Sequence, residues 1–159
     1  MLIIMAGLPG TGKSTVAKQL AKKINGVVLR SDVVRKELFA RPTYSAKETD
    51  EVYVELFDRA RSALPSPVIL DATFSERRHR KAAQKEALAL KIPFTIVLTD
   101  APESVVRERI AMRANDPSDA TFVNYLEKKA AFEPLEELHF RIDTSEELES
   151  QIDQILDSM

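Results

Sequence analysis

The segment at residues 7–14, which reads GLPGTGKS, constrains this chain more than any other part of its sequence. Three of the four glycines of the 159-residue chain lie in it, at Gly7, Gly10 and Gly12. Glycine adopts positive φ angles and lets the backbone approach a ligand closely, so the chain concentrates this freedom in a single loop. The apolar residues 2–6 directly before the loop predict a strand that is buried on both faces.

The loop matches the pattern G-x-x-x-x-G-K-[ST] and is followed by a helical pattern. In this arrangement backbone N–H groups wrap a phosphate, helped by the positive end of the helix. Lys13 is expected to reach the β- and γ-phosphates of ATP, and the Ser14 hydroxyl is expected to ligate Mg²⁺. A position between a buried strand and an amphipathic helix favours this interpretation over a chance match. We predict that ATP is bound by Gly7, Gly10, Thr11, Gly12, Lys13, Ser14 and Thr15.

The composition is that of an ordinary globular protein, 44% hydrophobic and 30% charged. No window approaches the roughly 20 apolar residues of a membrane span, and the first apolar run lacks the basic leader of a signal peptide. The absence of cysteine excludes disulfides and favours a cytoplasmic location. A net charge of −2 disfavours a strongly basic nucleic-acid surface, although it permits a local basic groove. We expect one domain, residues 1–159, without a membrane partner.

Short apolar runs alternate with helical patterns along the whole chain. We expect strands at residues 2–6, 27–29, 68–71, 93–99 and 138–142. We expect helices from the loop to Asn25-Gly26, at 33–40, at 46–64, at 75–90, from a capped start at 100–103, from 118 or 119, and after a capping box of Thr144 and Glu147. Strands that alternate with helices predict a parallel sheet covered on both faces, and hence an α/β domain.

The letters SDVVR follow the second expected strand and place Asp32 and Arg35 one helical turn apart, so that both can face one pocket. A hydroxyl that accepts a phosphoryl group needs a carboxylate to orient it and take its proton, and a cation can hold an acidic acceptor. We predict that Asp32 is the general base and that Arg35 positions the acceptor. A simpler interpretation makes Asp32 or Ser31 the N-cap of the next helix, with Arg35 on a solvated face.

The third expected strand ends in LDATF, and its apolar run before Asp71 has the form of a Walker-B carboxylate. Such a carboxylate acts on Mg²⁺ through water or holds a neighbouring side chain, and we predict that Asp71 supports the metal or the acceptor pocket. Its alternative role is to cap the strand end. The next helix begins with a basic cluster, which is usually a solvated face. We predict that only Arg80 of this cluster contacts the acceptor; the others are Arg77, Arg78 and Lys81.

The letters RERIAMR place Arg109 and Arg113 on one face of a helix that leads into an expected break at residues 114–118. Cations on a mobile pair of helices could close over the γ-phosphate and stabilise the charge of its transfer. We therefore predict a helical lid at about residues 107–130, in which Arg109 also contacts ATP. The alternative is a surface helix that is simply rich in arginine.

Three classes of protein use a loop of this kind: kinases, nucleotide-hydrolysing switches or motors, and non-catalytic nucleotide-binding modules. A GTPase switch would need an N/T-K-x-D segment and a D-x-x-G loop, and neither occurs in the sequence. The short chain disfavours a motor that works through contacts between subunits. A pure binding module would not need a carboxylate beside an acceptor pocket, so the residues favour a kinase.

With these motifs the chain resembles the small P-loop kinases related to polynucleotide 5′-kinases, zeta toxins and chloramphenicol phosphotransferase. The resemblance runs from GLPGTGKST through SDVVR, LDATF and RERIAMR to the last strand and helix, and is greatest to the ATP-binding segment found fused to aminoglycoside-phosphotransferase-like domains. It implies a three-layer fold, a five-stranded parallel sheet of order 2-3-1-4-5, and adenine contacts near Asp143-Thr144-Ser145. In the polynucleotide-kinase branch, the roles in catalysis and binding fall on Lys13, Ser14, Asp32, Arg35, Arg109 and Arg113.

The chain departs from the polynucleotide kinases at Phe74, where their D-x-T-N element carries asparagine. It also lacks the glycine-rich segment that shikimate kinases carry after the third strand. We therefore expect an ATP- and Mg²⁺-dependent phosphotransferase whose acceptor is a small molecule with a hydroxyl group. A nucleic-acid 5′-hydroxyl is the second acceptor class, and a regulatory ATP-binding module is the alternative outside enzymology.

Overall fold

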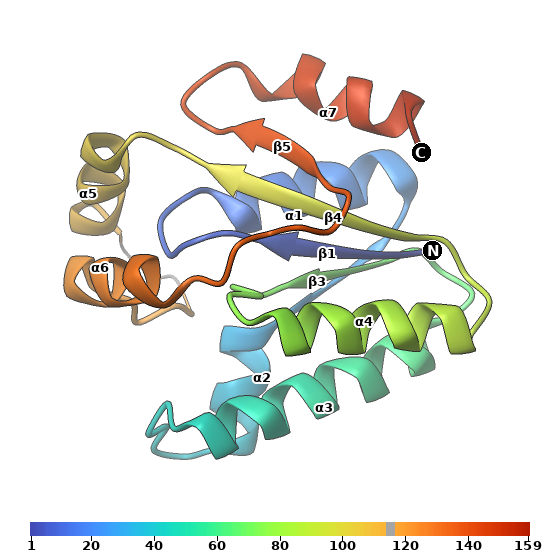
Figure 1. The fold of residues 1–159 in the computed structure, drawn as a ribbon, viewed down its shortest axis with the longest axis horizontal. Helices are drawn as coiled ribbons and strands as arrows, with labels where there is room; N and C mark the ends of the chain where they lie inside the picture. Colours follow the sequence, from blue (N-terminus) through green and yellow to red (C-terminus); the bar gives the residue numbers. More distant parts are fainter. Residues whose placement is uncertain (114–116) are drawn as a thin grey trace.

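The computed structural model describes residues 1–113 and 117–159 of the chain. Five parallel strands form one sheet in the order β2-β3-β1-β4-β5 (Figure 1). This is the order that the resemblance to P-loop kinases implied, so the predicted α/β fold class is confirmed. The strands are β1 Leu2–Ala6, β2 Val27–Arg30, β3 Val68–Asp71, β4 Phe94–Asp100 and β5 Phe140–Asp143.

Helices cover both faces of the sheet and give the fold three layers (Figure 1). One helical layer contains α1 and α7, and α3 and α4 lie on the opposite face. The helices in the described residues are α1 Lys13–Ile24, α2 Ser31–Leu38, α3 Ala46–Ala63, α4 Arg77–Ala89, α5 Glu103–Ala111, α6 Phe122–Ala131 and α7 Leu148–Asp157. None of them has both the length and the apolar character that crossing a bilayer requires.

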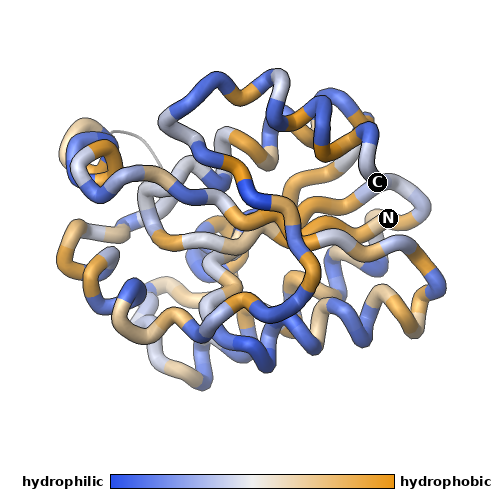
Figure 2. The backbone as a smooth tube through the Cα atoms, turned by 45° about the horizontal axis from the view of Figure 1, so that its top comes forward, coloured by the Kyte–Doolittle hydropathy of each residue, from blue (hydrophilic) through white to orange (hydrophobic). Residues whose placement is uncertain are grey.

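Strand β1 divides the core into two halves because its side chains alternate between the faces of the sheet. Ile4 packs in the core shared with α3 and α4, whereas Ile3 and Met5 pack in the core shared with α1 and α7. Every residue of this strand is at most 2% exposed. Figure 2 shows the same arrangement as hydrophobic strands between helices of alternating polarity. The continuous apolar run predicted this burial correctly.

The structure confirms some of the expected helix ends and corrects others. Helix α1 ends at Ile24, and its C-cap, Asn25, has a left-handed backbone conformation with φ of 52°. Helix α6 begins after Thr121, which forms a capping box with Asn124, and therefore later than residues 118 or 119. The expected break at 114–118 falls partly on residues 114–116, which lie outside the described residues.

Two predicted caps are wrong. Glu147 is itself the N-cap of α7 and accepts hydrogen bonds from the backbone of Glu149 and Ser150, so no capping box with Thr144 forms. Helix α5 has Pro102 at its N-cap without a side-chain cap. The two side chains that were expected to cap these helices have other partners. The Thr144 hydroxyl donates to the Thr11 carbonyl oxygen, and Asp100 forms an ion pair with Arg141.

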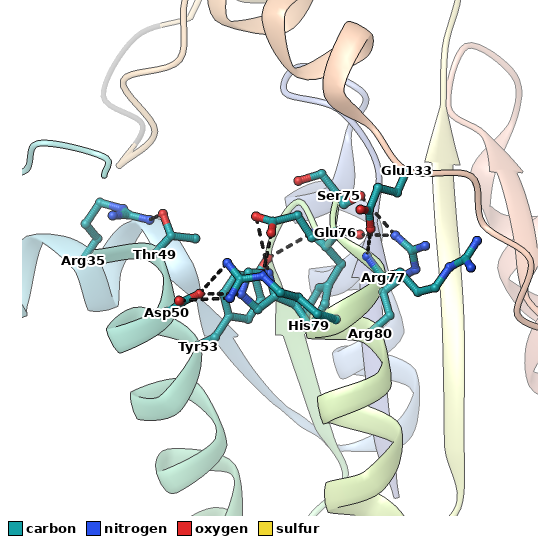
Figure 3. A network of polar contacts seen from close by, with 12 residues as sticks. Arg35, Thr49, Asp50, Tyr53, Ser75, Glu76, Arg77, His79, Arg80 and Glu133 are labelled. Atoms are coloured by element: carbon teal, nitrogen blue, oxygen red, sulfur yellow. Dashed lines mark hydrogen bonds and ion pairs between the residues drawn. The ribbon is translucent and has the colours of Figure 1, made fainter. Parts of the chain in front are cut away.

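Arg80 lies in the first turn of α4 and is fully buried, with 0% of its surface exposed. Its guanidinium donates to the carbonyl oxygens of Phe74 (3.0 Å), Ser75 (3.2 Å) and Pro134 (2.9 Å). Its Nε atom lies 3.2 Å from a carboxylate oxygen of Glu137. Arg80 thus joins the loop after β3 to the segment after α6, and Figure 3 shows it beside Arg77 on α4. This placement argues against the predicted acceptor contact, because Arg80 is fully buried, does not line the cavity described below, and has a protein oxygen beside each of its three nitrogen atoms.

Arg80→Ala should destabilise the fold by about 3–5 kcal/mol, because it leaves the Glu137 carboxylate and three carbonyl groups without their buried partner. Urea unfolding measures the change. Lys81→Ala removes an exposed cation from the same helix and should stay within about 0.5 kcal/mol of the wild type. Equal stabilities of the two variants would show that the buried contacts of Arg80 contribute little.

Candidate active site

A cavity of about 680 Å³ opens at the carboxyl ends of the strands. Its wall comes from the glycine-rich loop, the ends of β2 and β3, and the segments around α2, α5 and α6. Ten of the predicted site residues line it: Gly10, Gly12, Lys13, Ser14, Thr15, Asp32, Arg35, Asp71, Arg109 and Arg113. Chain segments that are far apart in sequence therefore meet at the edge of the sheet where an α/β fold binds its ligands.

Gly7 and Thr11 support the loop from behind and are not among the residues that line the cavity. Gly7 has φ of 139°, and a β-carbon there would lie 2.5 Å from the carbonyl oxygen of Thr99. Thr11 is 1% exposed, and its hydroxyl lies 2.8 Å from both the Leu8 carbonyl oxygen and the Thr99 hydroxyl. These contacts fix the loop against β4, so Gly7 and Thr11 shape the site from outside its surface.

Thr144, at the end of β5, connects the loop to Arg109. Its hydroxyl lies 2.9 Å from the Thr11 carbonyl oxygen, and Arg109 donates to the Thr144 hydroxyl (2.7 Å) and carbonyl (2.6 Å). Gly12 packs against the same threonine, because a β-carbon at Gly12 would lie 3.1 Å from the Thr144 side chain. The sequence predicted a helix cap and, through the resemblance, an adenine contact at this residue, but not its contact with Arg109.

Lys13 lies at the start of α1, and its ammonium group donates to the carbonyl oxygen of Leu8 across the loop (2.7 Å). Burial lowers the pKa of Lys13, while the carboxylates of Asp71 and Asp32 oppose that change. A half-buried cation that donates to one carbonyl of the loop can bind an anion, because its charge has lost part of its hydration. Phosphate is the anion that a loop of this shape fits.

Asp71 joins the loop to the neighbouring strand. Ser14 donates its hydroxyl to the Oδ2 atom of Asp71 (2.5 Å), and the Nε atom of Arg30 lies 3.2 Å from the same oxygen. Arg30 and Asp71 are direct partners in the β2–β3 register. Sequence reasoning missed Arg30, although the strand order and the ends of β2 and β3 together would have paired it with Asp71.

Ser14 and Asp71 supply the oxygen ligands that Mg²⁺ prefers. Within residues 1–113 and 117–159 no cluster of three or more histidine, cysteine, aspartate or glutamate side chains could hold a metal ion alone. The donor set therefore fits a Mg²⁺ ion that is bound together with phosphate oxygens and water. It does not fit a metal cage made by the protein alone.

Asp32 lies in the first turn of α2, and the N-cap of that helix is Arg30, which makes no side-chain cap bond. The simpler interpretation, in which Asp32 or Ser31 is the N-cap, is therefore wrong. Burial raises the pKa of Asp32; the Lys13 ammonium opposes this change, and the Asp71 carboxylate adds to it. A carboxylate whose affinity for a proton is increased in this way is suited to act as a general base.

Arg35 lines the cavity, but its guanidinium is also bonded to α3. It donates to Glu48 (3.4 Å) and to the hydroxyl of Thr49 (3.2 Å). The centre of the Tyr44 ring lies 4.8 Å from the guanidinium carbon, Cζ, of Arg35. Arg113 lines another part of the cavity and donates to the hydroxyl of Ser118 (3.1 Å). The structure thus brings both predicted arginines to the cavity, with Arg35 already engaged by a carboxylate.

Asp32→Asn should stabilise the protein increasingly as the pH rises from about 4 to about 7. Because the pKa of Asp32 is raised, the folded wild type holds this proton more tightly than the unfolded chain does and loses stability when it ionises. The measurement is the melting temperature of the variant relative to the wild type at both pH values. Asp157→Asn removes an exposed carboxylate outside the cavity and is the control. A constant or falling difference for Asp32→Asn would contradict this account.

The sequence of the chain matches a family of AAA domains over residues 2–135. Relatives include uncharacterized proteins of Mycobacterium tuberculosis (Rv2004c) and Mycobacterium bovis (Mb2027c), each 32% identical over 134 residues that cover 76% of this chain. The match covers 27% of each relative, so the chain spans only about a quarter of their length.

Solved structures of kinases share the fold. A gluconokinase from Sinorhizobium meliloti matches with a TM-score of 0.73 at 18% identity, over 98% of this chain and 93% of its own. The Mycobacterium tuberculosis APS kinase CysC, in complex with AMPPNP and APS, matches with a TM-score of 0.75 at 21% sequence identity, over 98% of this chain and 95% of its own. Kti12 of Chaetomium thermophilum, in complex with ADP-AlF3, matches with a TM-score of 0.77 at 21% sequence identity, over 99% of this chain and 96% of its own. The predicted resemblance to P-loop kinases is thereby confirmed, and the match over residues 2–135 shows that the chain belongs to the AAA domain family.

Proposed function

We propose that this chain is an ATP- and Mg²⁺-dependent phosphotransferase that moves the γ-phosphate of ATP to a hydroxyl group of a small molecule. Its family and its fold support a nucleotide-dependent phosphotransferase. The observation that carries the finer proposal is that Asp32 lines the same cavity as Lys13, Ser14 and Asp71. One cavity thus contains the side chains needed for the phosphate donor and a base for its acceptor.

The donor half of the site begins at the glycine-rich loop, whose backbone N–H groups at the start of α1 bind the phosphates of ATP. Lys13 exchanges its hydrogen bond to the Leu8 carbonyl for the β- and γ-phosphate oxygens. Ser14 and Asp71 hold Mg²⁺ together with the phosphates. When bound, Mg²⁺ neutralises part of the phosphate charge. The nucleotides named with two similar structures, AMPPNP and ADP-AlF3, support this half of the proposal.

The acceptor half depends on Asp32. Its carboxylate orients the acceptor hydroxyl, whose oxygen forms a bond to the γ-phosphorus while the bond between the γ-phosphorus and the β–γ bridging oxygen breaks. The hydroxyl proton passes to Asp32, and the products are ADP and a phosphate ester. Arg35 fixes the wall beside Asp32 through its bonds to Glu48 and Thr49.

We assign the lid function to α5 and α6, which pack against each other beside the end of β4 (Figure 1). The apolar contact between them includes Val106 and Tyr125. Arg109 and Arg113 line the cavity from this side, where their charges can stabilise the phosphoryl group during transfer. Arg109 also contacts the strand end at Thr144, which suits a residue that binds ATP before the lid closes.

Incubation with γ-labelled ATP and pooled acceptors tests the proposed reaction. The pools contain sugars, aminoglycosides, nucleosides and oligonucleotides with a 5′-hydroxyl. Label in a small-molecule ester supports the proposal, and label only in oligonucleotides would favour a polynucleotide kinase. Tight ATP binding without transfer to any acceptor would favour a regulatory ATP-binding module.

Asp32→Asn should lower kcat by roughly 10²- to 10⁴-fold and leave the affinity for ATP nearly unchanged, because it removes the base and retains the shape of the side chain. Steady-state kinetics and an ATP titration separate the two effects. Asp157→Asn should behave like the wild type. If Asp32→Asn bound ATP much more weakly but turned over normally once loaded, Asp32 would support the fold and would not act as the base.

Lys13→Ala should reduce both ATP binding and turnover, with kcat/KM for ATP lower by about 10²-fold or more, because it removes the cation that lines the cavity at the phosphate loop. The control is Lys18→Ala, which removes an exposed cation from the same helix and should have no effect. A Lys13→Ala protein with normal ATP affinity would contradict the assignment of the loop.

A further inference from the structure

The acceptor end of the cavity, meaning the part beyond Asp32 that is lined by α2, α3, the start of α4 and α6, has a distinctive charge pattern. The wall of a binding site reflects the charge of its ligand, because unpaired like charges brought together from water are costly. The partners of each charged side chain at this end therefore indicate the class of acceptor.

The arginine at this end is already neutralised. The Arg35 side chain is 9% exposed, and its guanidinium is shared between Glu48 and Thr49. Glu48 is fixed in turn, since its carboxylate accepts hydrogen bonds from the backbone N–H groups of Thr43 and Tyr44. An anionic acceptor group would have to compete with this buried carboxylate for the guanidinium, so Arg35 is a poor anion site here.

His79 is engaged in the same way, as Figure 3 shows. Its Nε2 atom lies 2.9 Å from a carboxylate oxygen of Asp50, and its ring stacks on Tyr53 with centroids 3.9 Å apart and planes 11° apart. The stack holds the imidazole in the cavity wall, and the Nε2 atom of the ring is engaged by Asp50. His79 therefore supplies a flat, carboxylate-paired surface and not a free cation.

Two further carboxylates line this end of the cavity. Glu76, at the start of α4, and Glu127, on α6, both line the cavity together with Asp32. Glu76 accepts a hydrogen bond from Arg78 at Oε2 (2.6 Å), and its Oε1 atom lies 3.9 Å from Nδ1 of His79; each oxygen can still accept a further hydrogen bond. Lys128 is an exposed cation in the same lining, so carboxylates predominate at this end without being its only charged groups. An ionised carboxylate only accepts hydrogen bonds, so this wall selects groups that donate them.

Between these acceptors lie the surfaces of Tyr44, Val52 and Tyr53. Tyr44 is 52% exposed, has a positive φ of 56°, and donates its hydroxyl to Asp119 (3.0 Å). A non-glycine residue with this conformation is costly and persists where contacts hold it, which marks it as a candidate functional residue. Aromatic and aliphatic faces beside hydrogen-bond acceptors match a ligand with C–H faces and hydroxyl donors at its edges.

We propose that the acceptor is a non-anionic polyol, either neutral or amino-bearing. Its hydroxyl or amino groups donate hydrogen bonds to Glu76 and Glu127, and Asp32 accepts the proton of the hydroxyl that reacts. This inference rests on the proposed phosphotransferase function and adds the chemical class of its substrate. Phosphate, sulfate or carboxylate groups at this end face carboxylates and find Arg35 already paired.

Three pools of polyols test the class, matched in carbon skeleton and carrying neutral, amino or carboxylate substituents. Each is incubated with the intact chain and γ-labelled ATP, and ATP binding is measured separately. We expect phosphoryl transfer to the neutral or the amino pool to be at least about ten times faster than transfer to the carboxylate pool. The rates with the neutral and the amino pool then show whether the preferred acceptor is neutral or cationic. Preferred transfer to the carboxylate pool would overturn the inference while leaving the kinase proposal standing. No transfer to any of the three pools, while another class of small molecule is labelled, would likewise overturn the inference alone; no transfer to any acceptor with ATP binding retained would overturn the proposed function itself.

Charge-neutralising variants test the residues with the best acceptor found. Glu76→Gln and Glu127→Gln should each raise the KM of that acceptor by roughly 5- to 10-fold, with kcat and the KM of ATP nearly unchanged, because each weakens a charge-assisted hydrogen bond. Asp157→Asn is the matched control outside the cavity. Glu127→Lys should in addition improve the use of the carboxylate pool relative to the neutral one. Unchanged acceptor KM values in both glutamine variants, with normal melting temperatures, would overturn the assignment.

Discussion

The contacts of Asp71 determine how the two halves of the site are arranged. The residue ends β3, where the parallel register places Met5 on one side and Arg30 on the other. Its carboxylate accepts the Ser14 hydroxyl and pairs with Arg30, so one 5% exposed side chain connects the phosphate loop to the end of β2. Because α2 and Asp32 follow directly after β2, a change in this register would displace the predicted base from the loop.

The charges of the site are held in an environment that opposes their ionisation. Burial lowers the pKa of Lys13 and raises that of Asp32, and the attraction between the two offsets only part of this cost. A folded chain that keeps such groups in place is less stable than it could be, but it needs little rearrangement when a phosphate arrives. At the acceptor end the pattern differs, because Arg35 and His79 are already paired with carboxylates. This difference is the basis of our proposal that one end of the cavity binds the phosphates and the other binds groups that donate hydrogen bonds.

The sequence was enough to predict that Lys13, Ser14 and Asp71 lie at one cavity, because the signals that mark these residues are local. The loop pattern, the buried strand before it and the apolar run before Asp71 each depend on adjacent residues. The basic cluster at the start of α4 led us to assign Arg80 to the acceptor, whereas the structure buries it inside the protein. Its spacing to Ala83 and Ala87, both fully buried on α4, shows the helical face on which it lies. That periodicity could have indicated that the arginine is buried.

Contacts between distant segments could not be predicted in this way. The bonds of Arg109 to Thr144 and of Arg35 to Glu48 join different elements, and no local pattern specifies them. The sequence analysis predicted that Arg35 positions the acceptor, and a single sequence gives no sign that Glu48 pairs with its guanidinium. Three-dimensional proximity was needed to separate an arginine that lines the cavity from one that is free to bind an anion.

The fate of the γ-phosphate in ¹⁸O-enriched water tests the central claim most directly. The protein is incubated with Mg²⁺, ATP and a pool of polyols, and the products are analysed by mass spectrometry. Direct transfer to an acceptor hydroxyl predicts a phosphate ester without solvent oxygen in the phosphoryl group, formed in step with ADP. ADP formation accompanied only by inorganic phosphate that carries one solvent oxygen would identify hydrolysis and contradict the account.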